Sequence, residues 1–260
     1  MVVYSASEGR RARASAKLTW AERIGEALDR EGGFVLHMQP ILDLATDQIS
    51  HGELLLRMRD DHGNLIGPDA FLPAAERFGL IHAIDRWVVR QAIRMIAESP
   101  RQPTLPFGVN VSGDSVVGDP HLLEMIEDEL HQASVDPKML IFEVTETAAI
   151  GNMPEATRFA RRINELGSSL ALDDFGTGFG SFYYLKHLPV QYLKLDGEFI
   201  QNLPRSEVDA HMVNAIVGIA QSLGIKTVAE SVSDEETIRL LRRHGVDYAQ
   251  GFHVGPPAPV

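Results

Sequence analysis

The stretch ALDDFGTGFGSF, residues 171–182, places two adjacent acids where an apolar run gives way to glycines. Side chains alternate between the two faces of a strand, so Asp173 and Asp174 cannot both point the same way in regular β-structure. Neighbouring carboxylates also repel each other unless a positive charge lies between them. We therefore expect a strand to end here, in a turn where a positive group holds both acids.

Seven other short apolar runs are spread along the chain. The eight runs are FVLHMQP (34–40), GELLLRM (52–58), LPFGVNV (105–111), MLIFEVT (139–145), SSLALDD (168–174), VQYLKLD (190–196), KTVAES (226–231) and VDYAQGF (246–252). Helical patterns lie between most of them, over residues 71–99, 121–133, 154–167, 181–188, 208–224 and 234–245. Strands that alternate with helices predict a parallel sheet. Eight such units in about 250 residues favour an α/β fold of the closed (β/α)₈ type, a TIM-like barrel, over the alternative of an open doubly wound sheet.

The segment between the first two runs, ILDLATDQISH (41–51), has no helical pattern. It predicts a hairpin, so one strand is expected to run antiparallel to the others. Residues 1–17 are small, polar and basic, which indicates a linker or the tail of an upstream domain; an amphipathic helix is expected over residues 18–31. No linker-like break follows, so residues 18–260 are expected to form one domain.

The composition excludes several classes of protein. A formal net charge of −12 argues against binding to a DNA or RNA polymer, which depends on basic patches. No apolar run approaches the roughly 18 residues of a membrane span, and the N-terminus lacks the apolar core of a signal peptide, so we expect a cytoplasmic location. The absence of cysteine excludes thiolate metal sites. The ten histidines are scattered, so an oxygen-ligand site for a hard cation is favoured over an imidazole site.

Each predicted strand carries polar residues close to its carboxyl end. In chain order these are Gln39, Glu53 with Arg57, Asn110, Glu143, Asp173 with Asp174, Lys194 with Asp196, Glu230, and Gln250. The carboxyl ends of parallel barrel strands meet at one rim, where such barrels build their active sites. Buried acids without partners are costly. The acids that would gather there against Lys194 and Arg57 are Glu53, Glu143, Asp173, Asp174 and Glu230. The excess of negative charge predicts divalent cations at this rim, which would be the positive groups between Asp173 and Asp174.

Taken singly, most of these residues also have a plain structural interpretation. Asn110 could cap a turn, Lys194 could pair with Asp196, and Gln250 could belong to a turn. Glu53 could lie on a solvated strand face, whereas Glu143 lies in a strongly apolar run, where an acid favours a functional role. The GTGFG segment by itself is a weak signal, since it lacks the spacing of dinucleotide and P-loop motifs.

The ordered set QPI, ELLLR, NVS, EVTE, DDFGTG, LKLD, AES and QGF resembles the EAL domain family, bacterial phosphodiesterases that open cyclic di-GMP to linear pGpG. The naming triplet reads Glu53-Leu54-Leu55 here, with Leu in place of the usual Ala. The resemblance extends from about residue 20 to residue 259. It implies a barrel with one antiparallel strand, two Mg²⁺ or Mn²⁺ ions, inhibition by bound Ca²⁺, and a homodimer. EAL domains usually follow a sensor or GGDEF domain, so such an upstream partner is expected in a longer protein; no GGDEF motif is present in this sequence.

The resemblance assigns roles position by position. One metal ion would be bound by Glu53, Asn110, Glu143 and Asp173, and a second by Asp173 and Asp174. The catalytic positions would be Lys194, Glu230 and Asp196, with Glu230 either a general base or a ligand of the second ion. Cyclic di-GMP would contact Gln39, Leu55, Arg57, Asp174, Gln250 and Phe252, with Phe252 stacking on a guanine. Glu146 would steady the DDFGTG loop that carries two of the ligands.

The sequence departs from the family pattern at three places, none of which is an expected metal ligand. The usual AEGVE reads Ala229-Glu230-Ser231-Val232-Ser233, the usual Tyr-Ser-Ser after the DDFGTG core reads FGS (179–181), and a basic residue is missing from GFHVGPP (251–257). We therefore expect a metal-dependent cyclic di-GMP phosphodiesterase. The alternatives are a non-catalytic cyclic di-GMP receptor with the same fold, and a different metal-dependent barrel enzyme.

Overall fold

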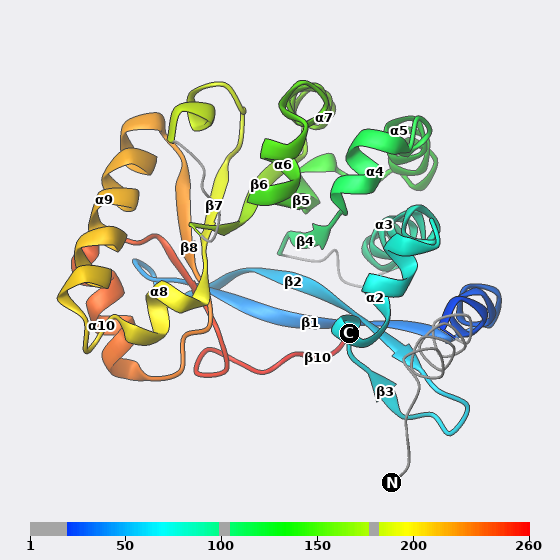
Figure 1. The fold of residues 1–260 in the computed structure, drawn as a ribbon, viewed down its shortest axis with the longest axis horizontal. Helices are drawn as coiled ribbons and strands as arrows, with labels where there is room; N and C mark the ends of the chain where they lie inside the picture. Colours follow the sequence, from blue (N-terminus) through cyan, green and yellow to red (C-terminus); the bar gives the residue numbers. More distant parts are fainter. Residues whose placement is uncertain (1–19, 99–104, 177–181) are drawn as a thin grey trace, which may run out of the picture.

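The computed structural model describes residues 20–98, 105–176 and 182–260 (Figure 1). The predicted linker, residues 1–17, and the departure at residues 179–181 lie outside these ranges. A helix over residues 20–29 agrees with the one expected over residues 18–31. Within the described ranges, no helix is both long enough and apolar enough to cross a membrane.

Eight strands close into a barrel, and each coincides with one of the predicted apolar runs. They are β1 (Phe34–Asp43), β2 (Gln48–Arg59), β4 (Phe107–Asn110), β5 (Leu140–Thr145), β6 (Ser169–Phe175), β7 (Tyr192–Leu195), β8 (Lys226–Ala229) and β9 (Tyr248–Gln250). Seven of these strands, β2 and β4 to β9, pair in parallel, and β1 closes the circle between β9 and β2. Two short strands, β3 (Leu65–Ile66) and β10 (Ala258–Pro259), extend the sheet at β2 and β1. The predicted (β/α)₈ barrel is confirmed.

The antiparallel member of the barrel is β1, which runs against both of its neighbours. The turn between β1 and β2 forms locally, because the Asp43 carboxylate accepts hydrogen bonds from the backbone N–H groups of Ala45 and Thr46 at 2.8 and 2.9 Å. Asp47 takes a left-handed backbone conformation (φ 56°), which acidic and amide residues tolerate better than most. The predicted hairpin is therefore correct.

Helices surround the barrel on its outer side (Figure 1). The longer ones are α2 (Pro68–Arg77), α3 (Ile81–Glu98), α5 (Leu122–Ala133), α7 (Met153–Leu166), α9 (Glu207–Leu223) and α10 (Glu235–His244). Short helical segments are α4 (Gly113–Gly118), η1 (Pro137–Met139), α6 (Glu146–Gly151), η2 (Phe182–Lys186) and α8 (Gly197–Asn202). The single pattern over residues 71–99 forms two helices, because the chain turns at Gly79 (φ 68°) between α2 and α3. The segments α4, α6 and α8 were not predicted.

The long helices end where their sequences provide caps. Ser206 accepts a hydrogen bond from the Asp209 N–H at the start of α9, and Asp234 accepts one from the Thr237 N–H at the start of α10. Gly224 and Gly245 close the same helices in the left-handed conformation (φ 73° and 76°), which glycine adopts without steric cost.

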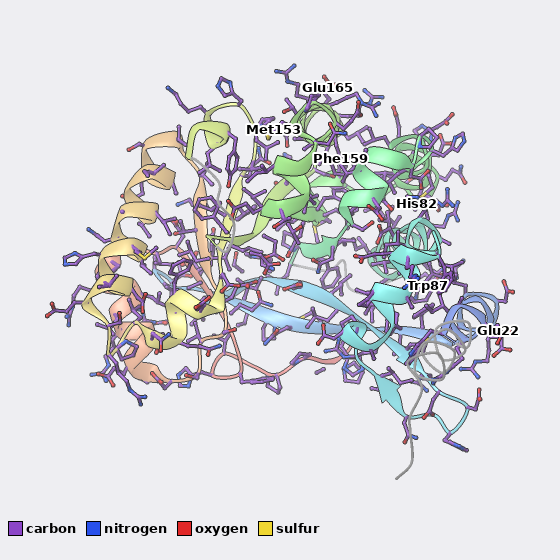
Figure 2. All side chains as sticks on the ribbon, viewed as in Figure 1. Glu22, His82, Trp87, Met153, Phe159 and Glu165 are labelled. Atoms are coloured by element: carbon purple, nitrogen blue, oxygen red, sulfur yellow. The ribbon has the colours of Figure 1, made fainter. Side chains whose placement is uncertain are left out.

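The core lies between the barrel strands and the helices around them (Figure 2). Strand β5 is buried on both faces, as its continuous apolar sequence predicts for a parallel sheet. Phe159 of α7 packs edge-on against Phe142 of β5, with ring centroids 6.3 Å apart, and Trp87 of α3 lies 5.6 Å from Phe34 of β1. Burying a side chain of this size contributes about 1.5–3 kcal/mol, so these contacts hold the helices to the barrel.

The register of the strands brings the predicted polar residues to one rim. Gln39 pairs with Glu53 across β1 and β2, Asn110 pairs with Glu143 across β4 and β5, and Thr145 pairs with Asp173 across β5 and β6. Lys194 of β7 is opposite Val228, two residues before Glu230. Residues far apart in the chain are thus placed at the same height of the barrel.

Candidate active site

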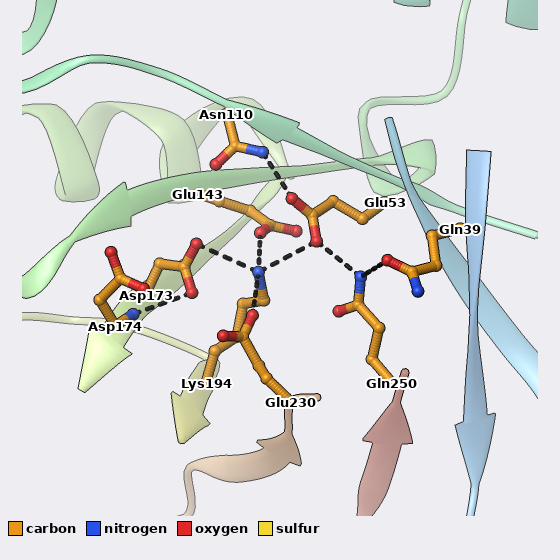
Figure 3. Close-up of polar contacts among 9 residues, drawn as sticks. All are labelled: Gln39, Glu53, Asn110, Glu143, Asp173, Asp174, Lys194, Glu230 and Gln250. Carbon is orange, nitrogen blue, oxygen red and sulfur yellow. Dashed lines mark hydrogen bonds and ion pairs between the residues drawn. The ribbon is translucent and has the colours of Figure 1, made fainter. Parts of the chain in front are cut away.

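The Lys194 ammonium lies at the centre of four carboxylates (Figure 3). Its Nζ is 2.6 Å from Glu143 Oε2, 2.8 Å from Glu230 Oε1, 3.1 Å from Asp173 Oδ2 and 3.2 Å from Glu53 Oε2. The lysine is 2% exposed, so these ion pairs surround a buried ammonium, and their acids come from four separate parts of the barrel. Among the described residues, Lys194 pairs with these acids and not with Asp196, which rules out the simple alternative of a Lys194–Asp196 pair.

Amide side chains complete the hydrogen bonding around Glu53. Asn110 Nδ2 donates to Glu53 Oε1 at 2.7 Å, and Gln250 Nε2 donates to Glu53 Oε2 at 2.7 Å and to Gln39 Oε1 at 3.1 Å. Gln39 in turn donates to the backbone carbonyl of Gly255 at 3.2 Å. The buried Oε1 of Gln250 has no hydrogen-bond partner among the described residues. Since buried polar atoms are nearly always paired, this oxygen is placed to accept a hydrogen bond from a bound molecule.

One ammonium does not neutralise four acids. The remaining negative charge shifts the pKa values of the acids and of Lys194. Burial, together with the charges of Glu53 and Asp173, raises the pKa of Glu143 well above its usual range. Burial and Asp173 likewise raise the pKa of Glu230 to about 8. Burial would also raise the pKa of Glu53, but Lys194 and the amide hydrogen bonds outweigh it and lower that pKa. Burial opposes the charge on Lys194, yet the surrounding acids raise its pKa.

The backbone conformation at Asp174 allows the side chains of Asp173 and Asp174 to point to the same side. Asp174 adopts a left-handed conformation (φ 53°), so the regular alternation of the strand breaks between the two acids. The Asp174 N–H donates to Asp173 Oδ1 at 2.9 Å. Burial and the neighbouring charges of Asp173 and Asp196 raise the pKa of Asp174. Both acids can therefore face the same region of the rim.

The oxygen donors of this rim fit a hard divalent cation. In the part of the chain that the structure describes, one group of three acids has oxygens within 4.8 Å of one another: Asp173, Asp174 and Glu230. Glu53 and Glu143 both pair with Lys194. The amide nitrogen of Asn110 donates to Glu53, and the side-chain oxygen of Asn110 has no hydrogen bond to any residue that the structure describes. Carboxylate and amide oxygens are the ligands that Mg²⁺ and Mn²⁺ prefer.

Two neighbouring features hold these acids in place. A Cβ atom at Gly108 of β4 would overlap the Glu143 carboxylate, so only glycine leaves room for this acid. The buried Glu146, at the start of α6, accepts hydrogen bonds from the Gly176 N–H at 2.7 Å and from the Tyr184 hydroxyl at 2.6 Å. It thereby ties the segment that follows Asp173 and Asp174 to the neighbouring βα unit.

A cavity of about 770 Å³ opens beside the acids. The predicted residues that line it are Gln39, Glu53, Leu55, Arg57, Glu230, Gln250 and Phe252. Phe252 is 76% exposed, and Arg57 donates one hydrogen bond to the backbone carbonyl of Leu56 at 2.8 Å. The cavity is large enough for a ligand of dinucleotide size.

A barrel rim with this ordered set of acids, amides and lysine invites comparison with known proteins. Residues 21–257 match the EAL domain family. The chain belongs to the EAL domain family.

Two of the relatives of this EAL domain are named cyclic di-GMP phosphodiesterases. The domain is 38% identical over 243 residues to the cyclic di-GMP phosphodiesterase PdeB of Shewanella oneidensis, covering 93% of this chain and 28% of PdeB. It is 36% identical over 245 residues to the cyclic di-GMP phosphodiesterase PdeF of Escherichia coli, covering 94% of this chain and 32% of PdeF. The chain thus spans about a third of the length of these relatives.

Solved structures of EAL domains share the fold. The PaMucR phosphodiesterase in complex with c-di-GMP superimposes with a TM-score of 0.86 at 34% identity, covering 93% of this chain and 98% of that one. The FimX EAL domain of Xanthomonas citri in complex with c-diGMP gives 0.88 at 31% identity, covering 96% and 97%. The barrel described above is therefore that of an EAL domain.

Most of the expected site residues of the EAL domain come together at the rim or in the cavity. Asp196 does not pair with Lys194: its carboxylate accepts a hydrogen bond from the Glu198 N–H at 2.7 Å and caps α8, and its charge contributes to the raised pKa of Asp174. The cavity also has lining residues that the sequence did not indicate, among them Gln201, Pro204, Arg205, Asp234 and Glu236. They belong to α8, to the turn after it and to the start of α10, and no motif in the sequence marks them.

The structure also explains one departure from the family pattern. Ser231, which stands where the EAL domain usually has glycine, keeps a left-handed conformation (φ 56°). A Cβ atom at Gly197 would overlap the Ser231 hydroxyl, so Gly197 provides the space for this larger residue. Leu54, in place of the usual Ala of the naming triplet, is 1% exposed and belongs to the core.

Proposed function

We propose that this EAL domain hydrolyses cyclic di-GMP to linear pGpG with the aid of two Mg²⁺ or Mn²⁺ ions. The observation that carries the proposal is the set of four carboxylates around Lys194, at the mouth of a cavity of about 770 Å³. The names of PdeB, PdeF and the PaMucR complex support the same substrate.

The donor set supports two metal positions. We assign Glu53, Asn110, Glu143 and Asp173 to one ion. We assign Asp173, Asp174 and Glu230 to the other, because their oxygens form the one close group of acids in the described residues. When bound, such ions supply a water of low pKa and neutralise the phosphate in an in-line displacement. The position of Glu230 in this group supports a ligand role over that of a general base.

The remaining residues act on the substrate and on protons. Lys194 keeps its proton, since the acids raise its pKa, and donates to the nucleophilic water or to a phosphate oxygen. Asn110 is a neutral donor, which limits the negative charge that a phosphodiester must approach. The orphaned oxygen of Gln250 accepts a hydrogen bond from the dinucleotide, and Phe252 offers it an aromatic face.

The substrate's charge is met by Arg57, which lines the cavity close to Glu53. Gln39 and Leu55 line the same wall and are assigned to substrate contact. Asp196 is assigned a catalytic role by its position in the family pattern, and its charge is one of those that raise the pKa of Asp174. Glu146 is assigned to positioning of the ligand-bearing segment.

The decisive experiment is product analysis with purified protein and cyclic di-GMP. We expect conversion to pGpG with Mg²⁺ or Mn²⁺, inhibition by Ca²⁺, and a loss of roughly 100-fold or more in Glu53→Ala, which removes a metal ligand. Turnover with neither ion, in protein shown to be folded, contradicts the proposal. Calorimetric binding without turnover indicates the receptor alternative.

The wider context of the domain is also part of the proposal. We infer that it works in the cytoplasm as a homodimer and belongs, in a longer protein, behind a sensor or GGDEF domain. The coverage of PdeB and PdeF, both about three times as long, supports a multidomain setting.

A further inference from the structure

A buried acid on the helix layer holds the chain segment that follows Asn110. Asp85 of α3 is 5% exposed, and its Oδ2 accepts hydrogen bonds from the Ser112 N–H at 3.0 Å and from the Ser112 hydroxyl at 2.5 Å. Ser112 lies two residues after Asn110, which is the last residue of β4. Helix α3 contacts both β4 and α4 (Figure 1). An acid outside the metal-binding rim is therefore bonded to the segment that carries an assigned metal ligand.

The burial of Asp85 makes these two hydrogen bonds important. Burial raises the pKa of Asp85, and the Ser112 donors oppose that rise. A carboxylate away from water depends on such donors, and hydrogen bonds to a carboxylate are shorter and about twice as strong as those between neutral groups. The bond from the N–H fixes the main chain of Ser112, and the bond from the hydroxyl fixes its side chain.

The same segment has a second contact with α3. The Ser112 hydroxyl oxygen accepts a hydrogen bond from the Ser115 N–H at 3.1 Å, which caps α4. The Ser115 hydroxyl lies 3.0 Å from Nδ1 of His82. His82 and Asp85 are three residues apart on α3 and so lie on one face of the helix. This face of α3 holds the start of α4 at two points.

On the barrel side, the segment is bonded to another assigned ligand. The Val111 N–H donates to the backbone carbonyl of Glu143 at 2.9 Å, and Asn110 pairs with Glu143 in the register of β4 and β5. The Asn110 side chain is exposed and reaches Glu53 through its amide nitrogen at 2.7 Å. Its direction therefore depends on how the backbone of residues 111 and 112 is held.

We propose that Asp85 is a positioning residue for the metal ion assigned to Asn110, because it fixes Ser112 and thereby orients the Asn110 side chain. This inference deepens the proposed function and rests on it. Loss of a residue that orients a metal ligand typically costs about 10- to 100-fold in metal affinity or activity. Among the described residues that line the cavity, Asp85 is absent, so its loss should weaken metal binding and leave the contacts with the dinucleotide in place.

The opposite end of the barrel provides a matched control. Asp247, directly before β9, accepts hydrogen bonds with its Oδ2 from the Thr227 N–H at 2.9 Å and from the Thr227 hydroxyl at 3.0 Å. The pattern is the same as that of Asp85 and Ser112, but Thr227 lies near the amino end of β8, away from the metal-binding rim. Loss of Asp247 should therefore destabilise the fold without affecting the ion.

Calorimetric titration of Mn²⁺ into the EDTA-treated protein measures the effect without turnover. We expect Asp85→Ala to raise the Kd of Mn²⁺ about 10-fold or more. Asp85→Asn keeps an acceptor oxygen for Ser112 and should retain the affinity of the unmodified protein, and Asp247→Ala should leave the Kd unchanged. In assays, Asp85→Ala should need about 10-fold more Mn²⁺ for half-maximal turnover, with an unchanged KM for cyclic di-GMP at saturating Mn²⁺.

A double variant tests the route through Asn110. When Asn110→Ala is already present, adding Asp85→Ala should not weaken Mn²⁺ binding further, because residues that act through one another are not additive. If Asp85→Ala does not fold, Ser112→Ala removes the hydroxyl contact from the other side and should also raise the Kd.

The outcomes separate this inference from the proposed function. Equal Mn²⁺ affinities of the unmodified protein and the variants at Asp85 and Ser112 overturn the inference. An equal loss in Asp247→Ala does the same, since any destabilised barrel would then bind the ion poorly, and additive losses in the double variant exclude the route through Asn110. Mn²⁺ binding without turnover by the unmodified protein contradicts the phosphodiesterase alone, whereas an unmodified protein that binds no Mn²⁺ contradicts both.

Discussion

Lys194 shows how a single side chain can organise a site. Its ammonium is shared by four carboxylates, three of them buried, which would repel one another strongly without it. The lysine satisfies only part of the negative charge, and the raised pKa values of Glu143 and Glu230 are the result. Metal ions require ionised ligands, so binding of a divalent ion should release protons from these acids.

The first prediction concerns Glu230 and the stability of the metal-free protein. Its pKa is about 8 in the folded chain and near its ordinary value of 4.5 when unfolded, so the folded state holds more protons between these pH values. The free energy of unfolding should therefore fall, on the order of a few kcal/mol, as the pH rises from about 5 to about 8. Denaturant titrations in the presence of EDTA measure this slope.

Glu230→Gln is the control for this effect, because it keeps the shape of the side chain but cannot ionise. We expect a clearly smaller slope in the variant, with Glu143 supplying what remains. Identical slopes in the two proteins would show that Glu230 ionises normally.

At the scale of secondary structure, the site depends on how one βα unit is tied to the next. Strand β6 carries Asp173 and Asp174, and Glu146 of α6 accepts a hydrogen bond from the N–H of Gly176, two residues after Asp174. The second oxygen of Glu146 accepts from Tyr184 in η2, whose pKa is raised by burial and by this carboxylate. The same acid thus links three elements around the end of β6.

The second prediction tests this link with Tyr184→Phe. The change leaves the buried Glu146 oxygen without its donor, which should cost about 1–3 kcal/mol of unfolding free energy. Turnover should also fall, because the segment that carries Asp173 and Asp174 loses one of its ties.

A double-mutant cycle with Glu146→Gln separates the link from unrelated effects. Residues that share a hydrogen bond should give an interaction energy of about 0.5–3 kcal/mol in denaturant unfolding. Additive effects of the two changes would mean that Glu146 and Tyr184 act independently.

At the scale of the whole molecule, barrel closure gathers acids from strands that are far apart in the chain. Lys194 and Glu53 are separated by 141 residues, and Gln250 and Glu53 by 197. The net charge of −12 adds to the repulsion at this rim. A divalent ion bound only by the closed barrel should therefore stabilise the entire fold.

The third prediction is that divalent ions raise the melting temperature. A ligand at 100 times its Kd adds about 2.7 kcal/mol of stability, which corresponds to a rise of roughly 5–10 °C for a domain of this size. Calorimetric scans with Mg²⁺, Mn²⁺ or Ca²⁺, compared with EDTA, measure the shift; Ca²⁺ is included because it prefers the same oxygen ligands.

Glu53→Gln is the matched variant for these scans, since it retains the hydrogen-bonding shape of the side chain and loses its charge. We expect the metal-dependent shift to shrink strongly in this variant. An equal shift in both proteins would indicate that the ions bind elsewhere.

The sequence alone determined the barrel, the hairpin at β1 and the acids, amides and lysine that meet at its rim. Local apolar runs define buried parallel strands, and an acid such as Glu143 within such a run is conspicuous. The order of the motifs along the sequence was sufficient to indicate the EAL domain family. The sequence did not predict the break between two helices at Gly79 or the short segments α4, α6 and α8. Short helices depend on tertiary contacts more than on their own sequence pattern.

Only the tertiary structure decided which partners these residues take. Lys194 could have paired with the nearby Asp196, but closure of the barrel surrounds it with four acids from other strands, and Asp196 caps α8 instead. Arg205 and Glu236 were invisible in the sequence, because exposed charges on helix ends are common and carry no pattern. Their shared cavity exists only once α8 and α10 pack beside the rim. A strand can be predicted from the apolar pattern of a short segment. The pairing of charges depends on distances between residues that are far apart in the chain, and these are set only when the barrel closes.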